Sequence, residues 1–434
     1  MKSNKMMFLR PSLRPVALAV AAGLSLGAMA PAQAGEDDTP LYLSLAHDIT
    51  RDSNFSRDSN RQAETINSTA LQVGIDKAYG RQTYTGSAKL SKLKYAHYGD
   101  LLNNDGKDIN GEVASEFLRD WRVAVGGAFN QNLNEIQNNQ DVTDRVSRNI
   151  RTYRDGNIAL QYGVGGLLAV MANYDTNKTG YSADRYKNNE STQHSNGLRL
   201  TYYSTDLFNY FIGQRLVRTN YPNNLYNKQI DDANTDVGAN WQVTGLSNLN
   251  ATLTRRTSVF SSTHDQPVHG WTGGLNWRYT PAGIVTYGVG LQRATGADRA
   301  KSSSATINAD GLTLKDYSVN NNSVNTILSL MAKAQLTGKT SLTTNYGLTR
   351  FAVDNKNVNM QCNSQGNLPS CSDTGVPADQ SSSIAHVTTL GLNYAATRSV
   401  NLGCSYQKYS QTVGAGRVAY DGHSVDCSAS LTID

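Results

Sequence analysis

The sequence predicts an all-β protein: a transmembrane antiparallel up-and-down β-barrel of about eighteen strands. Three observations lead to this fold class. Short polar turns recur along the chain, apolar and polar residues alternate between them, and the connections at the other end of the alternating segments are long and hydrophilic. Tight turns at one end of a hairpin array and long loops at the other are typical of outer-membrane barrels.

Eight short turns define the hairpins. They centre near Gly80, Leu118, Gly163, Asp206, Leu246, Pro281, Gly338 and Thr397. Each turn joins two alternating segments, so the turns account for sixteen strands. An opening strand at 41–49 and a closing strand at 418–433 bring the number to about eighteen, an even count that lets the first and last strands pair antiparallel.

Alternation along each strand predicts one face toward lipid and one toward water, because successive strand side chains point to opposite faces. Trp121, Val123 and Val125 alternate with Arg122 and Ala124. The same period of two runs through 237–243, 271–279, 285–292 and 425–433. The segment 88–95 breaks this period, which predicts a β-bulge near Ser91.

Aromatic residues gather beside the tight turns. They include Tyr79, Tyr84, Phe117, Trp121, Tyr162, Phe208, Tyr210, Trp277, Tyr279 and Tyr394. An amphipathic ring prefers the level of the lipid headgroups, so this set predicts an interfacial girdle. The tight turns are then periplasmic, and the longer connections face the outside.

Residues 1–34 are predicted to be a signal peptide. Four basic residues precede an apolar run at 16–30, and Ala32-Gln33-Ala34 gives a small-x-small cleavage site. A transmembrane anchor is the alternative, but the run is too short to span a bilayer. Sec-dependent export and cleavage near Ala34 leave 35–434 as a barrel domain in the outer membrane of a Gram-negative bacterium.

Composition and charge agree with a barrel and argue against nucleic-acid binding. The chain carries a formal net charge of +5, and the leader contributes four basic and no acidic residues, which leaves +1 for the rest. A charge this small gives no electrostatic support for binding a phosphate backbone. Hydrophobic residues make up only 38% of the chain, which is low for packed soluble cores of this length.

The four cysteines lie near the C-terminus, and the leader implies an oxidising compartment. Cys404 and Cys427 are equidistant from the connection at 413–417, so a hairpin folded there places them opposite each other. A reduced, lipid-facing pair is the alternative to a disulfide. Cys362 and Cys371 lie in one long polar loop and are a second disulfide candidate. No pair has Cys-x-x-Cys spacing, which argues against a redox or zinc motif.

The inward-facing positions are mostly small and polar, and such a lining leaves room for hydroxylated solutes. The predicted pore-lining residues are Arg122, Arg199, Arg278, Lys333, Asn240, Gln242, Asn276 and Gln292. The arginines and the lysine of this set predict passage of polar or anionic solutes. Asp426 is the clearest acidic residue among the inward positions. The alternative is that these arginines pair with loop carboxylates and stiffen the wall. The loop at 354–383 is expected to fold inward as a constriction.

No constellation predicts an enzyme. His194-Ser195-Asn196-Gly197 is similar to the His-x-Ser-Asn-Gly segment of outer-membrane phospholipases. In those enzymes His and Ser are two residues apart, whereas adjacent residues of a strand point to opposite faces. Neither a metal site nor a cofactor is predicted.

Two short segments carry a resemblance to a known family. Asp52-Ser-Asn-Phe-Ser-Arg57 resembles the Asp-Asp-Asn-Leu-Phe-Arg segment that opens barrels of the EpsL type, and Lys77-Ala-Tyr-Gly-Arg-Gln82 resembles their Lys-x-Tyr-Gly-Arg-Gln turn. The last strand, 427–433, is similar to theirs. These barrels belong to the β-barrel porin 2 group and accompany exopolysaccharide biosynthesis operons of Gram-negative bacteria.

The resemblance implies a channel for exopolysaccharide export, with the outer-membrane lipid, a polysaccharide and a periplasmic export complex as partners. Two alternatives stay open. One is a general or solute-specific uptake porin. The other is a structural or adhesive barrel that acts through its surface loops. The sequence does not fix the oligomeric state.

Overall fold

The computed structural model describes residues 41–433 apart from 135–145, 225–228, 262–266, 309–310, 364–369, 374–378 and 415–416. Side chains are described outside 296–322 and 353–381. The predicted leader at 1–34 lies outside the described residues, so its cleavage stays a prediction. Among the described helices, none is long and apolar enough to cross a membrane.

The described chain forms one antiparallel sheet of nineteen strands. The strands are β1 (Leu41–Asp52), β2 (Glu64–Tyr79), β3 (Gln82–Tyr95), β4 (Asn104–Phe117), β5 (Trp121–Leu133), β6 (Ile150–Tyr162), β7 (Leu168–Tyr181), β8 (Ser191–Thr205), β9 (Phe208–Asn220), β10 (Gln229–Thr244), β11 (Ser247–Phe260), β12 (Val268–Tyr279), β13 (Val285–Asn308), β14 (Gly311–Gln335), β15 (Thr340–Asn363), β16 (Ser370–Asp373), β17 (Asp379–Ala395), β18 (Val400–Gln411) and β19 (Tyr420–Ile433). Two short helices, α1 (Gly99–Leu102) and the 3-10 helix η2 (Asp184–Asn189), lie in connections.

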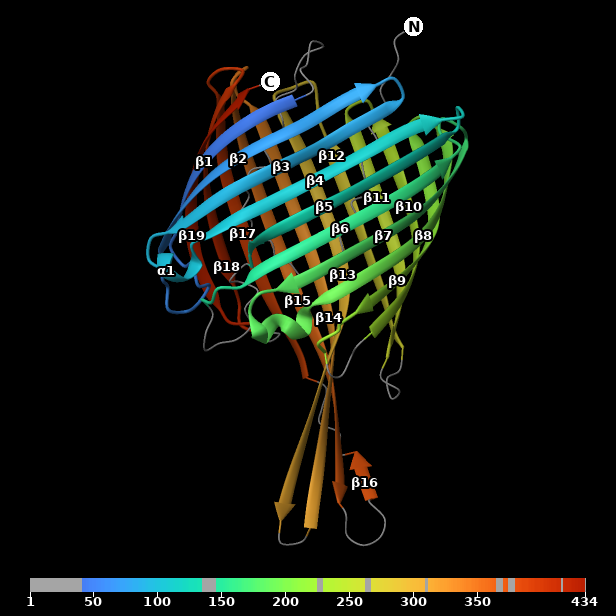
Figure 1. Ribbon diagram of the computed structural model, residues 1–434, viewed down its shortest axis with the longest axis vertical. Coiled ribbons are helices and arrows are strands. Elements are labelled where there is room, and N and C mark those ends of the chain that lie inside the picture. The colour runs from blue at the N-terminus through green and yellow to red at the C-terminus, as the bar shows by residue number, and fades with distance from the viewer. Residues whose placement is uncertain are drawn as a thin grey trace.

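The sheet closes into a barrel because β1 pairs with both β2 and β19. The closing register runs from Leu43 opposite Ile433 to Asp52 opposite Ser424. The wall has eighteen strands, since β16 pairs only with the far end of β15. The predicted fold class and strand number are therefore confirmed, and each predicted tight turn falls between two paired strands (Figure 1).

The bulge expected near Ser91 is wrong. The registers of β2 with β3 and of β3 with β4 run through Ser91 without a shift. Lys92 and Lys94 follow Leu90 on the outer face because β3 leaves the apolar zone there. The described irregularities lie instead beside tight turns, at Tyr203–Thr205 and Gln242–Thr244.

Three strands continue beyond the rim of the barrel. β13, β14 and β15 have 24, 25 and 24 residues, and their pairing continues to Asn308 opposite Gly311 (Figure 1). The expected inward constriction at 354–383 is wrong for its described backbone, which leads away from the barrel as the ends of β15 and β16. Cys362 is opposite Cys371 in register, but both side chains lie outside those described, so this disulfide stays a prediction.

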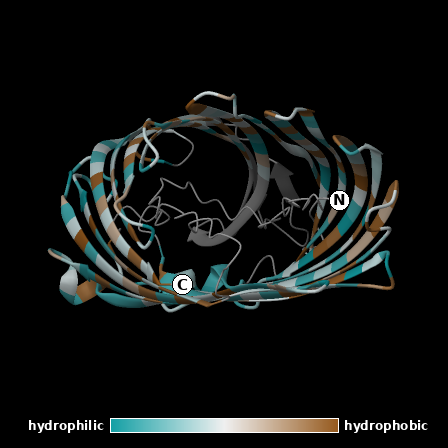
Figure 2. Cartoon of the chain, turned by 90° about the horizontal axis from the view of Figure 1, so that it is seen from above, coloured by the Kyte–Doolittle hydropathy of each residue, from teal (hydrophilic) through white to brown (hydrophobic). Residues whose placement is uncertain are grey.

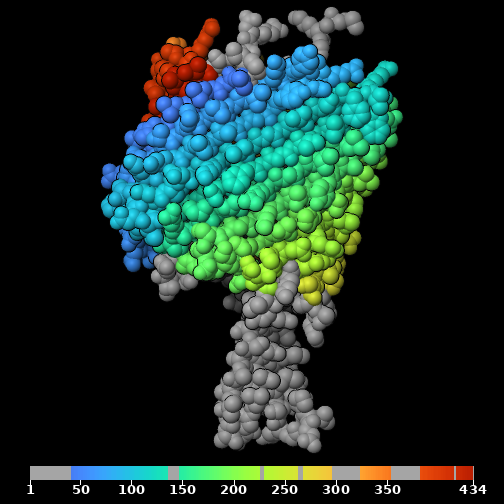
Figure 3. Space-filling view, viewed as in Figure 1, coloured from blue at the N-terminus to red at the C-terminus, as the bar shows by residue number. Residues whose placement is uncertain are grey.

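The outer face is apolar and the inner face is polar. Leu198 and Leu200 are 57% and 41% exposed, and Arg199 between them points to the other side. Bands of opposite hydropathy alternate along the strands (Figure 2), and side chains cover the outside in continuous slanting rows (Figure 3). The predicted disulfide between Cys404 and Cys427 joins β18 to β19 on this outer face.

A latch at the loop-side rim holds the first connection across the closing seam. Arg57 forms an ion pair with Asp52 at 2.8 Å, and both side chains are only 8% exposed. The guanidinium carbon of Arg57 lies 3.7 Å from the centre of the Tyr409 ring on β18. The Asn54 amide donates to the carbonyl oxygen of Asp421 on β19 at 2.9 Å. The segment that resembles the EpsL type therefore fastens the start of the barrel to its end.

Beside the latch, Glu64 fastens the connection that contains α1. Its buried carboxylate accepts hydrogen bonds from the backbone N–H groups of Thr65, Ala96, His97 and Tyr98. Burial by itself would raise the pKa of this carboxyl. The backbone donors outweigh burial and hold the pKa of Glu64 below its ordinary value of 4.5. The folded state therefore favours the charged carboxylate.

Replacing Arg57 with alanine is expected to lower the free energy of unfolding by about 3 kcal/mol, because it leaves the buried Asp52 carboxylate without its partner. Urea unfolding of the reconstituted barrel measures this loss. Arg61→Ala is the matched control: Arg61 pairs with Asp421 where both side chains are about 60% exposed, and such surface pairs contribute about 0–1 kcal/mol. Equal losses in the two variants would contradict the latch.

Glu64→Gln is expected to lower the free energy of unfolding by about 1–2 kcal/mol at neutral pH, because backbone donors lose a charged acceptor. The pKa of Glu64 is depressed in the folded state, so its contribution is fully present above pH 4.5 and is lost as the pH falls through the folded-state pKa. The wild type and the variant should therefore converge in acid. A constant difference in unfolding midpoint between pH 7 and pH 3 would contradict this role.

Candidate functional site

The candidate site is the inner wall of the barrel. Each predicted pore-lining residue alternates with outward-facing neighbours, so strand geometry places all of them on the inner face. They are Arg122 on β5, Arg199 on β8, Asn240 and Gln242 on β10, Asn276 and Arg278 on β12, Gln292 on β13, and Lys333 on β14. That they line a conducting pore stays a prediction. They are spread around the wall and do not form one cluster.

Part of this set is held by neighbouring side chains. The Arg199 guanidinium carbon lies 4.2 Å from the centre of the Phe211 ring on β9. The Asn240 amide donates to the Asn209 side-chain oxygen at 2.8 Å. Arg199 is therefore held by a ring of the neighbouring strand, and pairing of the inward arginines with loop carboxylates stays a prediction.

The inner wall also carries more carboxylates than Asp426, the one that the sequence singled out. They include Asp48, Asp76, Asp108, Glu112, Glu116, Asp155, Asp175, Asp232 and Asp236. Asp426 itself accepts a hydrogen bond from the Thr50 hydroxyl at 2.5 Å. Acidic and basic residues therefore share the inner face, and passage of polar or anionic solutes stays a prediction.

The strongest ion pair of this wall joins β10 to β11. Arg256 donates to both Asp232 carboxylate oxygens, at 3.1 and 2.9 Å, and the Ser258 hydroxyl donates to one of them at 2.5 Å. Asp232 is only 9% exposed. Four residues further along β10, Asp236 lies 3.6 Å from Arg215 of β9. These contacts cross-link β9, β10 and β11 from inside.

Charge is distributed unevenly around the lumen. The inner faces of β3 to β11 carry the ion pairs and most of the carboxylates. Among the described inner-face side chains of β12 to β18, the charged ones are Arg278 and Lys333. The others on that stretch are mainly Ser, Thr, Asn, Gln and Gly. One side of the lumen is thus a nearly neutral wall rich in amides and hydroxyls.

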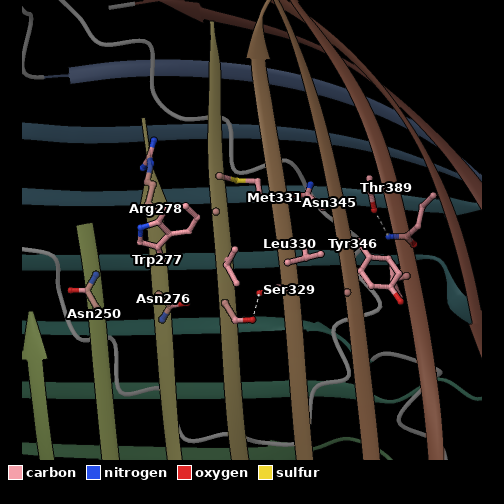
Figure 4. A pocket seen from close by; sticks show the side chains of 16 residues that line it. Asn250, Asn276, Trp277, Arg278, Ser329, Leu330, Met331, Asn345, Tyr346 and Thr389 are labelled. Carbon is pink, nitrogen blue, oxygen red and sulfur yellow. Dashed lines mark hydrogen bonds between the residues drawn. The ribbon is translucent and has the colours of Figure 1, made fainter. Parts of the chain in front are cut away.

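A hollow of about 510 Å³ lies in this neutral wall. Its polar lining includes Asn250, Asn276, Arg278, Ser329, Asn345, Thr389 and Gln407 (Figure 4). Gly288, Gly290 and Gly347 face it. The Met331 side chain lies over Gly288 and the Ser329 side chain over Gly290, so Gly347 is the open one of the three. A Cβ added at Gly347 would meet only the Val387 carbonyl oxygen, at 3.9 Å. The sequence therefore keeps space here that a larger side chain could occupy.

The chemistry of the hollow suits neutral or weakly anionic polar molecules. Amide side chains offer a donor and an acceptor each, and Arg278 adds one cation. Among the described residues there is no group of three or more potential metal ligands. His194 bonds to Tyr174 at 3.0 Å, while the neighbouring Ser195 is buried on the other face, so the described pair does not form a catalytic hydrogen bond.

Sequence reasoning missed the inward carboxylates and the hollow. The carboxylates on β10 could have been found from the sequence. Asp232 and Asp236 stand an even number of residues from the inward Gly238 and Asn240, so the same alternation places them on the inner face. No feature of the sequence predicted the hollow. It depends on glycines from β13 and β15 that pair with Ser329 of β14, a register that the sequence does not reveal.

No protein-family model matches the chain, and no curated protein matches it. Solved structures with a similar fold include OccK5 (OpdH) of Pseudomonas aeruginosa, 12% identical with a TM-score of 0.46, over 91% of this chain and 98% of that one. Another is the siderophore receptor PirA of Pseudomonas aeruginosa, 11% identical with a TM-score of 0.41, over 92% and 81%. The FrpB iron transporter of Neisseria meningitidis is 9% identical with a TM-score of 0.44, over 91% and 83%.

Asp232→Asn is expected to lower the free energy of unfolding by about 2–3 kcal/mol, because Arg256 loses its charged acceptor on the inner wall. Asp231→Asn is the matched control. Asp231 is the next residue, on the outer face, and pairs there with Arg218 where the two side chains are 44% and 61% exposed. Urea midpoints of both variants measure the difference, and a larger loss for Asp231→Asn would contradict the assignment of the two faces.

Proposed function

We propose that the protein is a passive channel in the outer membrane of a Gram-negative bacterium, and that its solute is an exopolysaccharide on its way out of the cell. The observation that carries this proposal is the neutral wall of β12 to β18 with its hollow, where amide and hydroxyl side chains lie beside the apolar Met331 and Val387. The predicted leader at 1–34 supports export from the cytoplasm, and the apolar outer face supports a place in a bilayer.

Sugar hydroxyls both donate and accept hydrogen bonds, and so do the side chains of the hollow. Asn276, Asn345 and Gln407 supply amides, while Ser329 and Thr389 supply hydroxyls. Conduction needs contacts that are favourable enough for entry and weak enough for release. A wall of neutral hydrogen-bonding groups meets this requirement better than a closely spaced set of ion pairs.

The resemblance to the EpsL type supports the export role and the periplasmic export complex as a partner. Its two clearest segments have structural positions: Asp52–Arg57 forms the rim latch and Lys77–Gln82 forms the first tight turn. These segments therefore support a shared barrel construction. The proposal that the solute is a polysaccharide rests on the neutral wall and on the family's association with exopolysaccharide operons.

A second candidate function is uptake of small charged solutes. The observation that favours it is the opposite wall, where Arg199, Arg215 and Arg256 face Asp175, Asp232 and Asp236. A lumen with charges of both signs provides separate contacts for the two ends of a zwitterionic solute. The two candidates differ in which wall the solute follows.

Gly347→Leu is expected to weaken block of the channel by neutral oligosaccharides about tenfold, a change of ~1.4 kcal/mol, because the new side chain fills the hollow. Gly391→Leu is the matched control: Gly391 lies on the inner face of β17 outside the lining of the hollow, and its added Cβ would meet Ser405 at 3.8 Å. Planar-bilayer recordings with a dextran or maltodextrin series measure the block.

Absence of channel events from folded wild-type protein would contradict the channel itself and favour the adhesive alternative. Conductance without oligosaccharide block, or equal block in both leucine variants, would contradict the neutral wall as the solute path and favour uptake of charged solutes. Deletion of the gene in a polysaccharide-producing strain tests export: unchanged surface polysaccharide would remove that role.

A further inference from the structure

A belt of cations surrounds the barrel on its outer face, near the end that carries the long connections. Its members are Arg51, Lys92, Lys94, Lys107, Arg154, Lys178, Arg218, Arg255, Arg293, Arg350 and Lys408, and all of them are exposed. They come from strands all around the wall, from β1 to β18. Five outward histidines, His47, His194, His269, His386 and His423, lie among them.

The other half of the same outer face differs. At the outward strand positions nearest the tight turns, the described cation is Lys77. Aromatic side chains are exposed there instead, including Trp241 at 45%, Tyr162 at 50% and Tyr394 at 43%. An aromatic girdle therefore marks one edge of the apolar band and the cationic belt marks the other.

Within the belt, like charges lie side by side. Arg154 on β6 is directly opposite Lys178 on β7, on the same face. Like charges placed directly opposite in a sheet repel each other, so this pair calls for an anion from outside the two strands.

Carboxylates of the outer face supply that anion for only a small part of the belt. The described outward acidic strand residues at this level are Asp105, Asp231 and Asp421. Asp231 pairs with Arg218, and Asp421 pairs with Arg61 of the first connection. Asp105 on β4 lies directly opposite Lys92 on β3. Neither Arg154 nor Lys178 forms an ion pair with a described residue. Most of the belt is therefore left for external anions.

We infer that the belt binds the phosphate groups of an anionic lipid in the leaflet on the loop side of the barrel. The belt follows the whole circumference, which matches an annulus of lipid and exceeds the contact area of a single protein partner. Lys and Arg stems lie along apolar surface while their charged ends reach the headgroups. Each such cation contributes about 1 kcal/mol to the attraction of an anionic leaflet.

The test compares Arg154→Gln/Lys178→Gln with Lys77→Gln, which removes an outward cation at the aromatic edge. Each protein is reconstituted in phosphatidylcholine nanodiscs with a rising fraction of bis-phosphorylated lipid A, and retained lipid A is counted by native mass spectrometry. We expect the double variant to need about 25-fold more lipid A for half-maximal retention, since ~1 kcal/mol per cation is about fivefold each. Lys77→Gln should match the wild type.

A second double variant, Lys92→Gln/Lys94→Gln on β3, keeps the test decisive if the first fails to fold. Equal retention by wild type and a folded belt variant would overturn the inference. So would an equal loss in Lys77→Gln. Inorganic phosphate is the last arm: displacement of lipid A at matched phosphate concentration would show a small-anion site in place of a lipid surface.

Discussion

Backbone hydrogen bonding in hydrocarbon is the constraint on which the rest of this structure depends. A strand edge left open in a bilayer would expose N–H and C=O groups that no water could satisfy. Wall strands that are consecutive in the sequence are brought together by the connection between them. The pairing of β1 with β19 is the exception, and it is this pairing that closes the edge of the sheet. The seam joins residues almost four hundred positions apart, such as Leu43 and Ile433.

The arrangement around the seam reflects its importance. Asp52, Asn54 and Arg57 hold the first connection to β18 and β19, and Phe55 from the same segment packs 5.7 Å from the Tyr95 ring. Closure in turn separates two environments. The outer face is ordered from aromatic girdle to cationic belt along the barrel axis, whereas the inner face is divided around the axis into a charged wall and a neutral wall.

The fold could be predicted from the sequence because both of its signals are local. A tight turn and a period of two are each read within about fifteen residues. Lys92 and Lys94 show where such a prediction fails. The alternation of apolar and polar residues breaks off in the same way at a β-bulge and where a strand leaves the membrane zone. The inward direction of the wall arginines could be predicted from the alternation along each strand. The Phe211 ring beside Arg199 and the open space at Gly347 depend instead on which residues of the neighbouring strands lie opposite. Local patterns carry no information about such registers.

The disulfide has a consequence for the order of events in assembly. Cys404 and Cys427 are flanked on the outer face by Leu402 and Val425, which are 44% and 43% exposed and would lie against acyl chains in an inserted barrel. Water-soluble oxidants and reductants do not enter hydrocarbon. The bond therefore has to form before insertion, in the aqueous compartment, and is chemically insulated afterwards. The last hairpin would then reach the membrane already covalently closed, as the partner that β1 must find.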